Sequence, residues 1–331
     1  MAENQNVKKR MYFRVIRTDE DVNCIVPKKK ERDERTIEKQ VLEHIEEGSK
    51  AGFQSSLISL TAEFNVALAF AGIISPVILT DLSDKSTKEV IHLDKEYLRS
   101  IMTDEVAKSR SRRSDEVLVL GQITSAQLLP IELKSCQRFL AQGFEESDSD
   151  IFPSDEVLHH AYNNKKIVTI GSLSGSNKRL FKVKINDEDF VACLPRPNYS
   201  LDDKVLFGQE LVDRCDHHFA CFCAYRCLAE DNVPKAAMYK FKLSVTHDDL
   251  PIQNFEWAMI LLEDFSLQNL DLANTVEKSR DLFATDILLG NWECVGVDKK
   301  DLISPKNAMY GRLTKSSKIV RYDFLFYYEK S

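Results

Sequence analysis

The chain has 331 residues, of which 43% are hydrophobic and 29% are charged, and its formal net charge is -7. This length predicts two domains of roughly 150 residues each, and the composition excludes a chain that is disordered throughout. The acidic balance argues against nucleic acid or an anionic membrane as the main partner.

The N-terminal residues are charged but lack the apolar stretch of a secretory signal peptide. The longest apolar run, Phe64 to Thr80, contains Asn65, Ser75 and Pro76. It is shorter than the roughly 20 apolar residues that a membrane-spanning helix needs. We therefore expect a cytosolic protein with no membrane span, whose eight cysteines stay reduced.

The first half predicts short strands mixed with two helices. Apolar alternation predicts strands at YFRVIR, SSLISL, PVILTDL and EVLVLGQI. Helices are expected near 36–48 and 61–72, so that a strand, a tight corner and a helix follow one another across QSSLISLTAEFNVALAFA. Hydroxyl groups remain at this corner, a place where sites are often built.

The acidic, serine-rich segment FEESDSDIFPS has the composition of a linker. We place the first domain at 1–145, the linker at 146–154 and the second domain at 155–331. The second domain opens with a hairpin-like segment, KIVTIGSLSGSNKRLFKVKINDEDFVACLP, and helices are expected from about Val205 and across VEKSRDLFATDILLGNW.

Three polar residues lie on predicted strands of the first half: Arg14, Ser59 and Glu116. The planar fork of an arginine suits a phosphate, and a carboxylate can accept from a hydroxyl or stabilise nearby positive charge. Taken singly, each residue can also be read as an exposed edge residue or as packing, because charges on strand surfaces are common.

The order of these three residues resembles the Arg-Ser-Glu class of mono-ADP-ribosyltransferases, which includes the pertussis and cholera toxin catalytic subunits. YFRVIR resembles the first strand of that class, and VLEHIEEGSKAGFQSSLISLTAEFNVALAFA resembles its histidine-bearing helix and its serine-rich strand. RRSDEVLVLGQITSAQLLPI resembles its glutamate strand. The resemblance covers about Met11 to Pro130 and implies a split β-sheet domain with flanking helices.

The resemblance implies that NAD is the substrate and that its nicotinamide-ribose bond is broken. Arg14 would hold a phosphate or ribose, and Ser59 and Thr61 would support the site at the strand corner. Glu116 would hydrogen-bond the ribose 2′-hydroxyl and stabilise the oxocarbenium-like transition state. His44 is a second candidate for the ribose, beside the alternative of a structural histidine near a helix end.

The acceptor-positioning place of the class falls at Ser114, next to Asp115. A carboxylate usually stands at that place for transfer to arginine, so simple hydrolysis of NAD stays an alternative. The basic stretch KSRSRRS before it is read either as a solvated loop or as a loop that faces a protein acceptor with an acidic surface.

The cysteine-rich stretch CDHHFACFCAYRC, residues 215–227, raises the question of zinc. It contains His217 and His218 but no CxxC pair, that is, no two cysteines with two residues between them, and its aromatic residues are typical of a packed amphipathic helix. The helix is the favoured interpretation, so no metal is expected there.

The second half resembles the HipA-like or protein-kinase-like group over about Lys166 to Phe326. The segments that carry the resemblance are DLFATDILLGNWECVG, KNAMYGRL and KIVRYDFLF. Asn307 and Asp323 are candidates for holding a magnesium ion, which makes ATP with magnesium a second cofactor hypothesis.

Three places depart from the kinase-like pattern. Glu293 stands where the group has its catalytic aspartate, Leu194 stands near the place of its lysine, and His218 falls near its helix glutamate. Phosphoryl transfer needs these groups positioned together. We therefore expect a shortened pseudokinase module that binds a target, a nucleotide or the first domain.

The leading hypothesis is an NAD-dependent enzyme that transfers ADP-ribose to a protein acceptor. The pairing with a kinase-like module suggests a bacterial effector or toxin that is delivered into a host cell by a dedicated secretion system. Two alternatives stay open. One is a non-catalytic binding protein with two relic domains, and the other is a phosphotransferase or nucleotidyl transferase that uses the second half.

Overall fold

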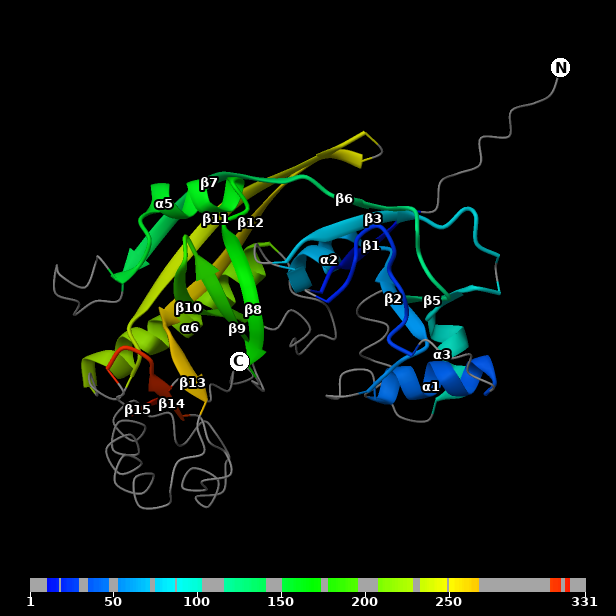
Figure 1. Cartoon of the computed structure of the whole chain (residues 1–331), viewed down its shortest axis with the longest axis horizontal. Helices are drawn as coiled ribbons and strands as arrows, with labels where there is room; N and C mark the ends of the chain where they lie inside the picture. The colour runs from blue at the N-terminus through cyan, green and yellow to red at the C-terminus, as the bar shows by residue number, and fades with distance from the viewer. Residues whose placement is uncertain are drawn as a thin grey trace, which may run out of the picture. The chain divides into compact units, whose positions relative to one another are not determined.

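The computed structural model describes most of the chain in separate stretches (Figure 1). The described residues are 11–17, 19–29, 35–47, 53–71, 75–86, 88–102, 116–140, 151–173, 178–195, 208–228, 233–248, 250–267, 310–316 and 319–321.

The elements of the first half are β1 Met11–Val15, α1 Ile37–Glu47, β2 Leu57–Thr61, α2 Phe64–Ala71, β3 Val77–Asp81, β4 Val90–His92, α3 Lys95–Ile101, β5 Glu116–Leu120 and β6 Ala126–Leu128. The elements that follow are β7 Ile131–Leu140, α5 Asp155–Asn163, β8 Ile167–Leu173, β9 Lys178–Ile185, β10 Glu188–Pro195, α6 Gln209–Leu228, β11 Ala236–His247, β12 Leu250–Glu263, β13 Phe265–Leu267, β14 Tyr310–Leu313 and β15 Ile319–Arg321.

The chain has a mixed α+β fold with two six-stranded antiparallel sheets, one formed by each half (Figure 1). The described residues divide into two compact units, and along the chain the boundary falls between Ile131 and Glu132. Residues Val245–Gln253, at the turn between β11 and β12, group with the first unit. Strand β7, which precedes the linker proposed from the sequence, belongs to the second sheet.

The first sheet has the strand order β4-β5-β2-β1-β3-β6. Strands β2 and β5 pair along their whole length, and so do β1 and β3. Within the described residues, β1 and β2 pair at one position, Phe13 with Thr61. We call this junction the seam, because it joins one set of three strands to the other.

Alternation along β2 sorts its side chains onto two faces. Ile58 and Leu60 pack into one apolar cluster with Val119 of β5. Leu57 lies on the other face with Leu118, against Val41 of α1. Both faces are therefore anchored by apolar contacts, which fixes the register, since a slip of one residue would exchange the two faces.

The corner between β2 and α2 is closed by Thr61, whose Oγ1 accepts a hydrogen bond from the Glu63 backbone N–H at 3.1 Å. Helix α2 then begins at Phe64, a little later than the sequence predicts, and buries most of its side chains. The predicted succession of strand, corner and helix is confirmed.

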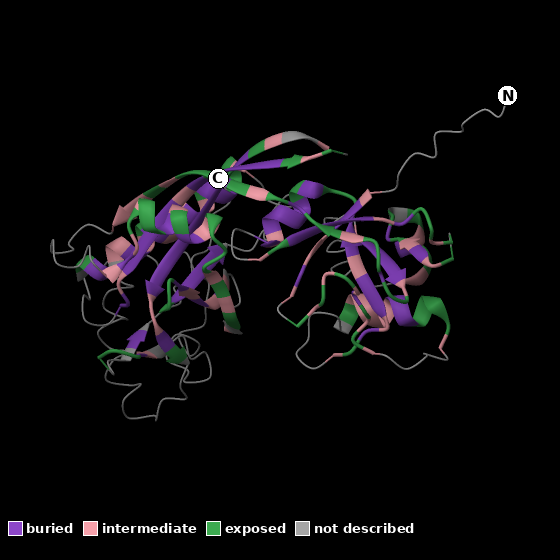
Figure 2. Cartoon of the chain, turned by 45° about the horizontal axis from the view of Figure 1, so that its top comes forward, coloured by how far each residue is buried: buried purple, intermediate pink, exposed green. Residues whose placement is uncertain are grey.

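The second unit builds its core between its sheet and α6. Figure 2 shows in purple how buried residues follow the strands. The sheet order is β7-β11-β12-β10-β9-β8. Cys215, Phe219 and Phe222 of α6 are buried in one cluster with Val191 and Ile260. The stretch 215–227 therefore lies on a packed helix, as its aromatic residues predict.

The small sheet β13-β14-β15 follows β12 and is tied to it at Asp264. The Asp264 carboxylate accepts from the Lys182 ammonium of β9 and from Thr314 Oγ1, the latter at 2.6 Å. The Thr314 backbone N–H also donates to the Asp264 carbonyl at 3.0 Å.

In the part of the chain that the structure describes, no helix is long and apolar enough to cross a membrane.

Candidate functional site

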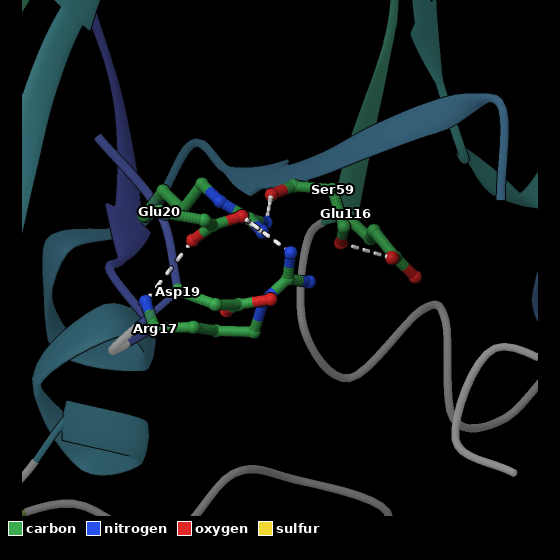
Figure 3. A network of polar contacts seen from close by, with 6 residues as sticks. Arg17, Asp19, Glu20, Ser59 and Glu116 are labelled. Atoms are coloured by element: carbon green, nitrogen blue, oxygen red, sulfur yellow. Dashed lines mark hydrogen bonds and ion pairs between the residues drawn. The ribbon is translucent and has the colours of Figure 1, made fainter. Parts of the chain in front are cut away.

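Ser59 and Glu116 lie on the same face of neighbouring strands. Ser59 is the register partner of Leu118, and Glu116 is two residues away on β5, so both side chains project to one side of the sheet. The Ser59 hydroxyl donates a short hydrogen bond to Oε1 of Glu116 (Figure 3). The Glu116 side chain is 18% exposed, and its Oε2 has no hydrogen-bond or ion-pair partner among the described residues.

His44, in the last turn of α1, approaches the same carboxylate oxygen. Its Nε2 lies 3.5 Å from Oε1 of Glu116, and its Nδ1 lies 2.7 Å from Oγ of Ser55. Ser55 Oγ in turn accepts from the Leu57 backbone N–H at 3.0 Å. A bare Nε2 lone pair would repel the carboxylate, so we assign a proton to Nε2, in either the neutral or the charged ring.

Arg14 of β1 is nearly buried, with 12% of its side chain exposed, and crosses the seam. Its Nη1 donates to the backbone carbonyl of Ser59, and its Nη2 donates to Oε1 of Glu20 at 2.6 Å. Its Nε is buried without a hydrogen-bond partner among the described residues. Arg14 therefore joins the two sets of strands one position from the seam pair.

Glu20 is the anion that holds this corner together, and only 5% of its side chain is exposed. Besides Arg14, it binds the Arg17 side chain at 2.9 Å through Oε1 and accepts from the Arg17 backbone N–H at 3.0 Å through Oε2. Arg17 also contacts Asp19, its Nε lying 3.1 Å from Oδ1 (Figure 3). A short turn after β1 thus fixes two arginines with one carboxylate.

The structure brings together Arg14, Ser59, Glu116 and His44, which the sequence proposed as site residues. Thr61 is buried beside them as the register partner of Glu116. Ser114 and Asp115, the proposed acceptor-positioning residues, lie outside the described residues.

The kinase-like positions are described only in part. Leu194 is fully buried on β10, and His218 lies on α6. Glu293, Asn307 and Asp323 lie outside the described residues. In the stretches that the structure describes, no group of three or more His, Cys, Asp or Glu residues could hold a metal ion.

Sequence reasoning missed Ser55, Arg17 and Glu20. Ser55 precedes the strand and carries no periodic signal of its own. Arg17 and Glu20 belong to the charged run RTDED, which looks like an ordinary solvated turn. A pair of arginines three residues apart next to an apolar strand, with an acidic residue three positions after the second, is the one local signal that points to them.

Among the described residues, the arrangement leaves Oε2 of Glu116 without a partner beside a set of fixed donors. Oε1 of Glu116 is approached by both Ser59 and His44, so Oε2 is the oxygen that can accept from a bound hydroxyl or face a developing positive charge.

Comparison of the chain with protein-family models, with curated proteins and with solved structures gives no match.

Proposed function

We propose that this chain is an NAD-dependent mono-ADP-ribosyltransferase in which Glu116 is the catalytic residue and Ser59 and Arg14 position it. The observation that carries the proposal is the hydrogen bond from Ser59 to Glu116, next to the contact from Arg14 to the Ser59 carbonyl. Arg14 and Ser59 are 45 positions apart along the chain, and Ser59 and Glu116 are 57 apart. They nevertheless form one hydrogen-bonded group on the neighbouring strands β1, β2 and β5.

Cleavage of the nicotinamide-ribose bond requires a fixed negative charge near the ribose C1′. When the C1′–N1 bond breaks, its electron pair leaves with nicotinamide and positive charge develops on the ribose. The acceptor forms the new bond to C1′ and releases its proton to solvent. Glu116 serves through Oε2, which accepts from the ribose 2′-hydroxyl and faces the developing charge, and this electrostatic stabilisation acts mainly in the transition state.

Ser59 and His44 keep the Glu116 carboxylate in place. The hydrogen bond from Ser59 and the longer contact from His44, both to Oε1, restrict rotation of the carboxylate, so Oε2 is positioned before the substrate arrives. Such preorganisation costs no further rearrangement at the moment of reaction. Thr61 supports the same corner through its bond to the Glu63 N–H, and Arg14 joins β1 to β2 at the seam.

The second half supports a kinase-like fold by its order of elements. Strands β8, β9 and β10 precede the long helix α6, and β11 and β12 follow it. The buried Leu194 has no charge to offer a nucleotide phosphate, which favours a pseudokinase role in binding a target over phosphoryl transfer. With a protein acceptor as its target, the chain is proposed to be a bacterial effector or toxin.

Incubation of the full chain with labelled NAD and cell lysate tests the proposal. We expect nicotinamide release and labelling of one or more acceptor proteins. Loss of the Glu116 carboxylate in Glu116→Ala should lower the rate by about a hundredfold to a thousandfold, the usual cost of removing an electrostatic stabiliser. Glu96→Ala, an exposed glutamate in the first turn of α3, is the matched control. Equal rates for wild type and Glu116→Ala would contradict the proposal.

A thermal shift with NAD separates the enzyme from the non-catalytic alternative. A ligand that binds the native state raises its stability, so millimolar NAD should raise the melting temperature of wild type. No shift, together with no nicotinamide release, favours a binding protein. ATP turnover with magnesium that is lost in Asp323→Ala would instead favour a phosphotransferase in the second half.

A further inference from the structure

We propose that Arg17 contacts the diphosphate of NAD and that Asp19 is the counter-ion that the diphosphate displaces from it. The inference rests on the proposed function and adds a binding residue to it. It also gives Arg14 a positioning role in place of the ligand-binding role that the sequence suggests.

Both Nη atoms of Arg14 bind groups of the protein itself. Its side chain is almost buried, and its two Nη atoms bind the Ser59 carbonyl and the Glu20 carboxylate. Releasing Arg14 to a ligand would remove one of the two arginines that Glu20, which is more deeply buried, binds, and weakening the compensation of a buried charge is unfavourable. Arg14 therefore holds β1, β2 and the following turn in register.

Arg17 is the more accessible of the two arginines. Its side chain is 38% exposed, against 12% for Arg14. Glu20 fixes it at both ends, because Oε1 binds its Nη2 and Oε2 accepts from its backbone N–H. Arg17 is thus oriented in advance, which lowers the entropy lost when it binds an anion.

Asp19 is a partner that a ligand can replace. Its side chain is 68% exposed, and exposed ion pairs contribute little to stability. Partial burial works against ionisation, but the hydrogen bond and the charge of Arg17 outweigh it and lower the pKa of Asp19, so the carboxylate is ionised at neutral pH. A diphosphate carries more negative charge than one carboxylate and matches the guanidinium fork, so it should replace Asp19.

The cluster is continuous with the candidate catalytic residues. Glu20 binds both arginines, Arg14 binds the Ser59 carbonyl, and the Ser59 hydroxyl binds Glu116. Figure 3 shows the Arg17 side chain extending from its backbone toward the side on which Ser59 and Glu116 lie. A dinucleotide whose nicotinamide ribose meets Glu116 would then have its diphosphate within the same network.

Steady-state kinetics with NAD and calorimetry with ADP-ribose test the inference on the full chain. Arg17→Ala should raise KM for NAD and Kd for ADP-ribose by about tenfold to a hundredfold, the usual loss of a hydrogen bond to a charged group. Its kcat should change by no more than about threefold, because a contact made equally in ground and transition states affects KM alone. Asp19→Asn should lower both KM and Kd by about twofold to fivefold.

The controls separate binding from folding. Arg17→Lys keeps the charge without the fork and should fall between wild type and Arg17→Ala. Arg99→Ala removes an exposed arginine of α3 and should leave KM unchanged. Higher ionic strength should raise the wild-type KM more than that of Arg17→Ala, because salt screens an exposed charge.

Unchanged KM and Kd in Arg17→Ala would overturn the inference while leaving the proposed transferase intact. A fall in kcat and melting temperature together, with no change in Kd, would show a purely structural arginine and would also overturn it. Tight ADP-ribose binding that Arg17→Ala weakens, in a chain that never releases nicotinamide, would support the diphosphate site and contradict the transferase.

Discussion

The hydroxyl of Ser59 donates to Oε1 of Glu116, although the register partner of Ser59 is Leu118. The contact is diagonal across two strands and is made on the face where Leu57 and Leu118 form an apolar cluster with α1. The apolar part of this face fixes the register, and the polar part lies beyond it. Packing thus decides where the carboxylate is held.

Ser59→Ala should lower kcat for NAD turnover by about tenfold or more while leaving the fold intact. The variant loses a hydrogen bond to a charged group, which is worth about 1.5–3 kcal/mol. Nicotinamide-release assays measure the kcat, and circular dichroism shows whether the fold is intact. The matched control is Ser100→Ala, whose hydroxyl is exposed and donates to the Tyr97 carbonyl. Global unfolding of Ser59→Ala would instead assign the serine to architecture.

His44→Ala should lower kcat by about tenfold or less, because the contact from Nε2 to Glu116 is long for a hydrogen bond. Ser55→Ala should act in the same direction, since Ser55 orients the ring through Nδ1. If Ser55 works only through His44, the double variant should be no slower than His44→Ala alone. Additive losses in this double-mutant cycle would contradict the arrangement.

Arg14→Met should destabilise the chain by about 3 kcal/mol, because it leaves a buried carboxylate short of its main partner. The double change Arg14→Met with Glu20→Gln removes both charges and should recover part of that loss. Urea unfolding followed by fluorescence gives the comparison. The urea midpoint should be highest for wild type, lower for the double variant and lowest for Arg14→Met. If Arg14→Met is as stable as wild type, Arg14 does not stabilise the seam.

The strands of the candidate site could be predicted because their alternation is local. Ile58 and Leu60 lie on one face of β2 and Ser59 on the other, and this period is visible along the chain. Arg14 stands out because it interrupts an otherwise apolar strand, and Glu116 stands out because it opens one. Their meeting is a property of the strand order β5-β2-β1, which no local pattern of the sequence predicts.

The supporting contacts could not be predicted in the same way. Glu20 binds Arg14 because a turn brings it back against β1, and Ser55 meets His44 because α1 packs beside β2. Neither contact leaves a periodic pattern. Strands β11 and β12 were not predicted either, although Tyr239, Phe241 and Val245 of β11 alternate with polar residues and so show the period of a strand. Helix α3 was missed because it has only 7 residues.

The cysteines give a test of the second unit that does not depend on function. Burial, with the charge of Asp155, raises the pKa of Cys136 to about 12 against the opposing effect of Arg138. Burial also raises the pKa of Cys215 well above its usual value, whereas Cys227 is exposed.

Since the thiolate is the species that alkylates, Cys136 with a pKa of about 12 is reactive in roughly one molecule in ten thousand at pH 8. Iodoacetamide at pH 8 should therefore label Cys227 first and leave Cys136 and Cys215 unmodified in the native chain. Raising the pH to about 9 should increase the Cys136 rate about tenfold, because its thiolate fraction rises tenfold per pH unit below the pKa. Peptide mass spectrometry follows each site, and labelling in urea is the control in which all sites should react. Native labelling of Cys136 as fast as that of Cys227 would contradict the partial burial of Cys136 on β7.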